Sequence, residues 1–233
     1  MNRNGWIRCT AMLAALGLLL TAGLHRTAEA AAGTQDAPTV IVLDPGHGGI
    51  DGGAVSASGI VEKDINLSIA LKLRQLLTLS GYTVIMTRET DCSIHDPSAK
   101  TVRKIKTSDI RNRLALMKQY GGVFVSIHQN SFPESKYSGA QFFYAAAPGS
   151  AELAECFRTA VCAQLQTDNK RATKPCTDDV YLIYHASTTA VLAECGFLSN
   201  PEEAAALSSE AYQREMAFAL YCGLIRFFQT NGG

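Results

Sequence analysis

The chain lacks an excess of charge of either sign. Its 233 residues include 21 Lys and Arg and 21 Asp and Glu, so the formal charge at pH 7 is zero. Nucleic-acid-binding proteins usually carry a basic excess or a basic stripe, so no nucleic-acid partner is expected. Hydrophobic residues make up 47% of the chain, which supplies a core and excludes wholesale disorder. The length fits one domain of ordinary size.

Two short motifs are also missing. No two of the seven Cys have the Cys-x-x-Cys spacing of zinc ribbons or thioredoxin-like redox sites. The glycine-rich stretch at 44–59 is not followed by the Gly-Lys-Ser/Thr of a phosphate-binding P-loop, although an anion-binding loop remains an alternative there. Cys156, Cys162 and Cys222 lie in apolar helical patterns, where Cys behaves as a small core residue, so we favour that interpretation over disulfides.

One long apolar run stands at the N-terminus. Two arginines precede the apolar residues 9–24, and Ala28-Glu29-Ala30 offers a small-residue cleavage site. This order is typical of a secretory signal peptide. The run is near the lower length limit for a membrane-spanning helix, so a retained anchor is the alternative. Residues 1–32 are therefore predicted to be a signal peptide or N-terminal anchor, and the protein is predicted to be exported to an extracytoplasmic site.

In the rest of the chain, short β-branched runs alternate with stretches of helical periodicity. Strands are expected at 39–43, 82–87, 123–127, 139–145, 180–184 and 190–193. Helices are expected at 64–80, 150–165 and 210–228, with a short one opening at Pro201 and another that Ser108 would cap, after a surface loop at 88–107. This alternation predicts an α/β fold: a single domain with a mostly parallel twisted sheet and helices on both faces.

Chemically active side chains stand at the ends of three predicted strands. His47 follows the first strand, His128 ends the strand that begins at residue 123, and Glu194 ends the strand that begins at residue 190. Glu62 stands at the start of the first helix, from where its side chain can point back to the same edge. Because the carboxyl ends of parallel strands share one edge of a sheet, we expect these four residues to lie together.

Two His and one carboxylate form a ligand set that is typical of zinc with a fourth position open for water. Zinc lowers the pKa of bound water to about 7, and a carboxylate off the metal can accept its proton. Glu194 is the candidate for that second carboxylate. The alternative is that both histidines are merely hydrogen-bonded at strand ends, because the ligands are far apart in the chain and no short motif fixes their spacing.

Four motifs stand in the order seen in zinc-dependent N-acetylmuramoyl-L-alanine amidases (amidase type 3). They are Asp44-Pro-Gly-His47-Gly-Gly-Ile-Asp-Gly-Gly-Ala54, Glu62-Lys-Asp-Ile-Asn-Leu67, Ser126-Ile-His128-Gln-Asn130 and Leu192-Ala-Glu194-Cys-Gly-Phe-Leu-Ser-Asn-Pro-Glu-Glu203. The chain resembles this family over nearly all of 40–228.

The resemblance implies a zinc hydrolase that cuts the amide between the lactyl group of N-acetylmuramic acid and L-alanine of the stem peptide in peptidoglycan. It places the zinc ligands at His47, Glu62 and His128 and the catalytic glutamate at Glu194. It also implies that residues 38–230 form the catalytic domain.

Three further stretches resemble the germination-specific, spore-cortex branch of that family: 139–144, the basic Lys170-Arg171 with Lys174, and 180–184. In that branch the enzyme strips stem peptides so that muramic lactam can form in the cortex. This implies a role in sporulation and germination, on the wall or cortex side of the membrane. Two further interactions remain open: attachment to the membrane through an N-terminal anchor, and binding to an accessory protein.

Two other functions remain open. A zinc peptidoglycan carboxypeptidase also uses two His and a Glu, but its first His and Glu are spaced as His-x-x-Glu, unlike His47 and Glu62. A non-catalytic cell-wall-binding module with a structural zinc would close the metal with a fourth ligand. The presence of both Glu62 and Glu194 argues against such a module.

Five neighbouring residues carry weaker expectations. Gln129 stands where many family members have Ala and is expected to narrow the cleft. Cys195 is expected to pack behind Glu194 rather than to react. His185 is either a cleft residue that helps to stabilise an oxyanion or a surface histidine. Arg88 and Arg113 are expected to form structural ion pairs rather than substrate contacts.

Overall fold

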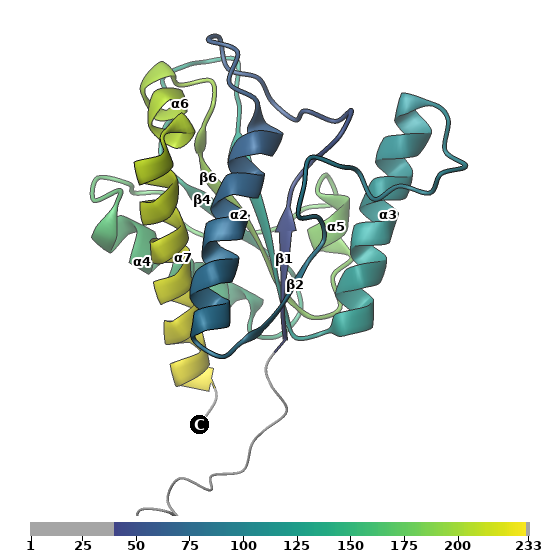
Figure 1. Cartoon of the computed structure of the whole chain (residues 1–233). Coiled ribbons are helices and arrows are strands. Elements are labelled where there is room, and N and C mark those ends of the chain that lie inside the picture. Colours follow the sequence, from purple (N-terminus) through teal and green to yellow (C-terminus); the bar gives the residue numbers. More distant parts are fainter. Residues whose placement is uncertain (1–39, 232–233) are drawn as a thin grey trace, which may run out of the picture. The chain divides into compact units, whose positions relative to one another are not determined.

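The structure is a computed structural model that describes residues 40–231, which are drawn in colour in Figure 1. The predicted signal segment 1–32 and the first residues of the predicted 38–230 domain lie outside the described residues. The strands are β1 (Val40–Pro45), β2 (Thr83–Met86), β3 (Val123–Asn130), β4 (Gln141–Tyr144), β5 (Lys174–Pro175) and β6 (Thr189–Phe197). The helices are α2 (Glu62–Leu79), α3 (Val102–Tyr120), α4 (Ser150–Gln164), α5 (Tyr181–Tyr184), α6 (Pro201–Ser208) and α7 (Glu210–Asn231).

The six strands form one mixed sheet in the order β2-β1-β3-β6-β4-β5. Strands β2, β1, β3 and β6 are parallel neighbours, whereas β4 pairs antiparallel with β6. The carboxyl ends of β1, β3 and β6 therefore meet at one edge, next to the start of β4. The predicted α/β fold with a mostly parallel sheet is confirmed.

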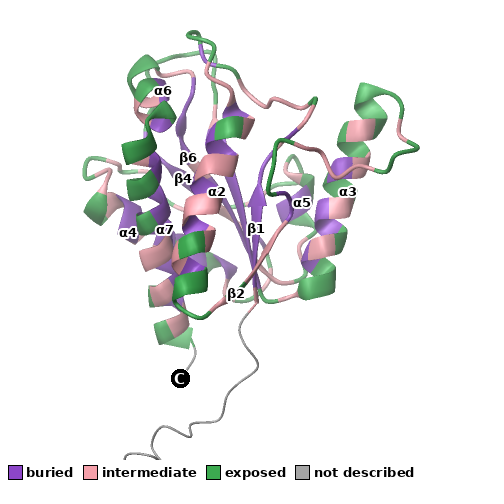
Figure 2. Cartoon of the chain, viewed as in Figure 1, coloured by how far each residue is buried: buried purple, intermediate pink, exposed green. Residues whose placement is uncertain are grey.

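Helices cover both faces of the sheet (Figure 1), as the sequence predicts. Along β1, Ile41 and Leu43 pack in the core cluster that contains α2, α4 and α7, while Val42 between them packs in the cluster that contains α3 and α5. This alternation follows from the opposite directions of successive side chains in a strand. Figure 2 shows the sheet buried between the two helical layers, with exposed residues on the outer faces of the helices. None of the helices in residues 40–231 is both long and apolar enough to cross a membrane.

Two expected elements are wrong, and each has a local cause. Helix α3 begins at Val102 rather than after Ser108, and the hydroxyl of Thr101 caps it by accepting from the backbone N–H of Lys104 (3.3 Å). Its first two turns contain only two apolar residues, Val102 and Ile105, and most of their side chains are exposed, so no apolar face reveals them. The expected strand at 180–184 is a helical turn, α5, which buries the consecutive residues Leu182 and Ile183 together; a strand would send them to opposite faces.

Candidate metal centre

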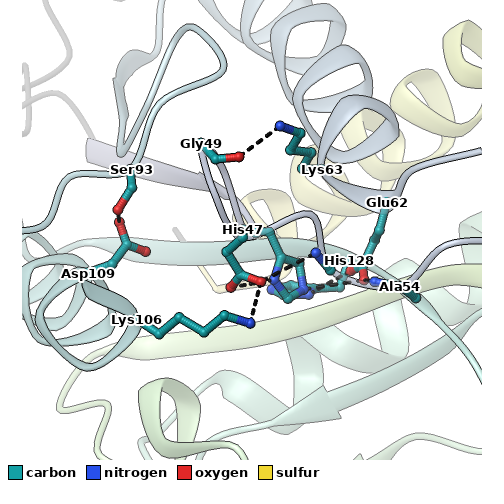
Figure 3. A network of polar contacts seen from close by, with 12 residues as sticks. His47, Gly49, Ala54, Glu62, Lys63, Ser93, Lys106, Asp109 and His128 are labelled. Atoms are coloured by element: carbon teal, nitrogen blue, oxygen red, sulfur yellow. Dashed lines mark hydrogen bonds and ion pairs between the residues drawn. The ribbon is translucent and has the colours of Figure 1, made fainter. Parts of the chain in front are cut away.

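Three residues that are distant in sequence meet at the carboxyl edge of the sheet. His47 follows β1, His128 lies on β3, and Glu62 is the first residue of α2. The Glu62 carboxylate lies between the two rings: Oε2 is 3.3 Å from His47 Nε2, and Oε1 is 3.0 Å from His128 Nδ1 (Figure 3). One ligand atom from each residue lies within 4.8 Å of the others. Such a group can hold a metal ion.

Two glycines allow these side chains to approach the backbone. A Cβ on Gly46 would lie 2.1 Å from His128 Nε2, and a Cβ on Gly53 would lie 2.4 Å from Glu62 Oε2. Both distances are far inside van der Waals contact, so no larger residue fits without moving a ligand. Of the two His128 ring nitrogens, Nδ1 is the one that faces Glu62.

A second layer of polar contacts orients the three side chains. Asp51 Oδ2 lies 3.0 Å from His47 Nδ1, and Asp51 Oδ1 lies 2.7 Å from Lys106 Nζ. A carboxylate on one ring nitrogen of a histidine fixes the tautomer and leaves the other nitrogen for a metal. Glu62 also accepts from the backbone N–H groups of Ala54 (2.8 Å) and Gln129 (3.1 Å). Burial acts to raise the pKa of Glu62, but the imidazoles of His128 and His47 keep it well below the usual range.

Two buried arginines hold the loop that carries His47. Arg113 donates to the carbonyls of Pro45 (2.9 Å) and His47 (2.7 Å) and forms an ion pair with Asp44 (2.6 Å). Arg88 donates to the carbonyls of Pro45 (2.9 Å) and Gly46 (3.0 Å), and also to Lys63 at the start of α2 (2.8 Å). These bonds stabilise His47 in the left-handed backbone region (φ 62°), which residues other than glycine rarely adopt.

Replacing Arg113 by Met is expected to lower the free energy of unfolding by about 3–5 kcal/mol, because Asp44 would keep a buried charge without its cationic partner. Urea denaturation of the two proteins measures the difference. Arg158→Met is the matched control, because its partner Glu155 lies on an exposed helix surface and such pairs contribute about 0–1 kcal/mol. Equal effects of the two substitutions would contradict the assigned role of Arg113.

Glu194 lies on β6 directly opposite His128 in the β3–β6 register. The residue is half-buried, but its Oε2 atom is buried and has no hydrogen-bond partner among the described residues. Burial raises the pKa of Glu194 to about 7, against the opposing effect of His128. A carboxyl group with a pKa near neutrality is suited to accept a proton in one step and donate it in the next.

A cavity of about 330 Å³ connects these groups. His47, His128 and Glu194 line one part of it, and Ile110 of α3 with Leu182 of α5 line the apolar wall. Glu194 and two of the three candidate ligands, His47 and His128, therefore line the same cavity. Two imidazoles and a carboxylate match the donors of a zinc site that keeps a position open, so the residues present fit such an ion.

Metal affinity is expected to depend on pH through His47. Burial acts to lower the pKa of His47, but Asp51 and Glu62 raise it to about 9. Because an imidazolium cannot ligate, metal binding below this pKa must release one proton. The apparent dissociation constant should therefore rise about tenfold as the pH falls from about 8 to about 7. Competition with a chelator at several pH values measures it.

The Asp51→Asn variant is the control for this dependence, because it removes the charge that contributes to the raised pKa. Its metal affinity should vary less steeply over the same range. An affinity for the wild-type chain that is independent of pH would contradict a raised pKa at His47.

The structure brings together all four residues named from the sequence, but it changes the view of their neighbours. Arg113 forms the expected ion pairs, whereas Arg88 binds backbone carbonyls rather than a carboxylate. Gln129 does not narrow the cleft: it is buried, and its Nε2 donates to Asn66 Oδ1 (3.1 Å). His185 is exposed and packs against Tyr181 rather than lining the cavity.

Cys195 is fully buried, and burial raises the pKa of its thiol, which disfavours a nucleophilic thiolate. All six Cys in the described part of the chain are free. Cys156, Cys162 and Cys222, which were interpreted as packing residues, are among these free Cys and are partly buried.

Asp51, Lys106 and Asn66 are functional neighbours that the sequence reasoning missed. Asn66 Nδ2 donates to Glu62 Oε1 (3.2 Å) and to the Gly46 carbonyl (3.2 Å), which links the His47 loop to α2. Asp51 and Asn66 both lie inside the quoted motifs, so their presence beside ligands was a usable signal. Lys106 had no such signal in the sequence, because only the folding of the chain brings it next to Asp51.

Comparisons with known proteins agree with this arrangement. A sequence model of the family described as N-acetylmuramoyl-L-alanine amidase matches residues 41–226. The chain is 36% identical over 195 residues to the germination-specific N-acetylmuramoyl-L-alanine amidase of Bacillus subtilis (strain 168), covering 83% of this chain and 81% of that protein.

Two solved structures are similar throughout the described part. The CwlD amidase from Clostridioides difficile, in complex with the GerS lipoprotein, is 42% identical with a TM-score of 0.80, covering 83% of this chain and 100% of that one. AmiC2 of Nostoc punctiforme is 27% identical with a TM-score of 0.71, covering 82% and 97%. The mixed sheet and its flanking helices are common to these proteins.

Proposed function

The chain belongs to the N-acetylmuramoyl-L-alanine amidase family, and from that premise we propose how its clustered side chains perform the reaction. The protein is an enzyme that hydrolyses the amide between N-acetylmuramic acid and L-alanine of the stem peptide in peptidoglycan. One observation carries the assignment of the site: His47 and His128, which cluster with Glu62, line a cavity together with Glu194, whose buried Oε2 has no partner among the described residues.

The proposed ion is zinc, held by His47, Glu62 and His128. Imidazole nitrogens favour zinc over magnesium or calcium, which prefer shells made of oxygen. When bound, zinc would polarise the amide carbonyl and make a water molecule acidic enough to attack at neutral pH. Asp51 and Asn66 keep the ligands oriented, and the two arginines keep the His47 loop in place.

Glu194 is the proposed general base and then the general acid. Its unpartnered Oε2 accepts a proton from the water molecule while the water oxygen attacks the lactyl carbonyl carbon. The protonated carboxyl group then donates this proton to the L-alanine nitrogen while the carbon–nitrogen bond breaks. The products are a lactyl carboxylate and a peptide with a free amino terminus. A pKa of about 7 suits both transfers.

The cellular setting is proposed from the relatives. The similarity to a germination-specific amidase supports a role in the spore cortex, where the removal of stem peptides precedes the formation of muramic lactam. We assign residues 1–32 to the signal peptide or anchor and 38–230 to the catalytic domain, which puts the enzyme on the wall or cortex side of the membrane. Amino-terminal sequencing of the exported protein tests this: a start after Ala30 indicates cleavage, and a start at Met1 indicates an anchor.

An accessory partner is proposed because the CwlD amidase was solved with the GerS lipoprotein. The full chain, purified with a tag from its own cells, should carry a bound lipoprotein that mass spectrometry identifies. Recovery of a fully active enzyme with no bound protein would contradict this part of the proposal.

Digestion of purified peptidoglycan with the zinc-loaded protein tests the function. The expected product is a free stem peptide that begins with the amino group of L-alanine, identified by mass analysis. Release of a single terminal residue would instead indicate a zinc carboxypeptidase, and binding without cleavage would indicate a wall-binding module.

A further inference from the structure

A second hollow lies at the same edge of the sheet as the metal centre, on the β4 side. This groove has a volume of about 580 Å³, and Lys136, Tyr137, Lys170 and Arg171 are among the residues that line it. Lys136 and Tyr137 belong to the connection that leads from β3 to β4, a few residues after His128. Lys170 and Arg171 belong to the segment that follows α4.

The groove is tied to the strand that carries Glu194. Gln141 on β4 is the register partner of Glu194 on β6, and Arg171 Nη1 donates to Gln141 Oε1 (3.2 Å). The sites therefore follow one another along the edge in strand order: His47 at β1, His128 at β3, Glu194 at β6, and the groove beside β4. A substrate extending from the scissile bond in this direction would reach the groove.

Arg171 is held rigidly there. Its Nε donates to the Ser138 carbonyl (2.7 Å), and its guanidinium lies 4.5 Å from the ring centroid of Phe197. Stacking on an aromatic ring and two hydrogen bonds fix the plane of the group, so little conformational entropy remains to be lost when an anion binds.

The cations of the groove outnumber its carboxylates: Lys136, Lys170 and Arg171 line it together with Asp168 and Glu203. In residues 40–231, neither Lys136, Lys170 nor Arg171 forms an ion pair within 4.0 Å. Glu203 accepts from the backbone N–H groups of Gly139 and Phe197, both at 2.8 Å, and keeps its negative charge near Arg171, so the two carboxylates offset only part of the three positive charges. Net positive charge therefore remains for a ligand.

We propose that this groove binds a free carboxylate of the stem peptide, beyond the L-alanine whose amide is cut. This proposal rests on the proposed function of the metal centre. The substrate extends from the scissile bond as a glycan on one side and as a peptide on the other. The glycan is built of N-acetylated sugars and is largely uncharged, whereas the peptide carries free carboxylates, so charge complementarity selects the peptide.

The test compares two soluble disaccharide-peptides, one with free peptide carboxylates and one with the same carboxylates amidated. The variant Lys136→Ala/Lys170→Ala removes two exposed cations and leaves the anchored Arg171 in place. Its KM for the free-carboxylate substrate should rise about tenfold, since it loses charge-assisted contacts, while kcat stays within about twofold. Its KM for the amidated substrate should equal that of the wild-type enzyme.

Lys104→Ala/Arg111→Ala is the matched control. These two exposed cations line another groove, on the outer side of α3, that has no strand of the metal centre in its wall. This variant should keep the wild-type KM for both substrates. An equal rise in its KM would show a general charge effect and would overturn the proposal.

Two other results would also overturn it. An unchanged KM for the free-carboxylate substrate would show that the groove does not bind the substrate. An accessory protein would then be the alternative ligand of the groove. A KM that rises equally for both substrates would show recognition of a neutral group. Failure of the wild-type enzyme to cleave either substrate would instead refute the proposed function, so the two failures are distinguishable.

Discussion

Glu194→Ala should retain its metal ion and lose about a hundredfold to ten-thousandfold in kcat, the range associated with general acid–base groups. Glu194 is not needed to hold the ion, because His47, Glu62 and His128 approach one another without it. The water and the leaving nitrogen would both lose their proton carrier, since no other unpartnered carboxylate oxygen is buried in the described residues.

Glu194→Gln is the control for packing, because it keeps the shape of the side chain and removes only its ability to carry a proton. Both variants should bind one metal ion per chain, measured by elemental analysis, and both should be almost inactive. A Gln variant that turns over within tenfold of the wild-type rate, with its metal in place, would show that another group moves the proton.

His128→Ala and His47→Ala should lose the metal ion and the activity together. Each replacement leaves two ligands, and the buried Glu62 carboxylate loses one of its two imidazole neighbours. Three protein ligands hold the ion in catalytic zinc sites, so the loss of one should lower the affinity severely. Chelator competition measures the affinity, and hydrolysis of a soluble muropeptide measures the activity.

The matched comparison is Asp51→Ala, which removes the carboxylate behind His47 and leaves all three ligands present. Changes of this kind typically cost about 10–100-fold in metal affinity or activity. The effect should be smaller than that of removing either histidine, and excess zinc should restore most of the activity. A histidine variant that keeps wild-type affinity would remove that histidine from the site.

The site was predictable because its reactive side chains follow the carboxyl ends of strands, and the sheet brings these ends together. His47 and His128 follow short β-branched runs, and such runs read clearly as buried strands. Parallel strand order then places their ends at one edge, which is where the structure has them. Glu62 was identifiable because it starts a helix whose apolar residues recur every fourth position, at Ile65, Ile69 and Leu73.

The polar contacts around the three ligands were less predictable, because their partners come together only in the tertiary structure. Arg113 pairs with Asp44 as expected, but it also donates to the His47 carbonyl, and Arg88 donates to backbone carbonyls instead of a carboxylate. The order of side chains in a sequence does not show which backbone carbonyl an arginine will bind. Ser108 was expected to cap a helix, although it lies inside α3, where the next residue, Asp109, binds Ser93 (2.8 Å) and Arg113 (2.6 Å).

Hydrolysis in water labelled with heavy oxygen tests the central claim most directly. If this enzyme cuts the amide between the lactyl group and L-alanine, the label must enter the lactyl carboxylate of muramic acid, and the released peptide must start with an unlabelled L-alanine. Mass analysis of both products locates the label. Label in a carboxyl group of the peptide, or in no product while peptidoglycan is bound, would contradict the account.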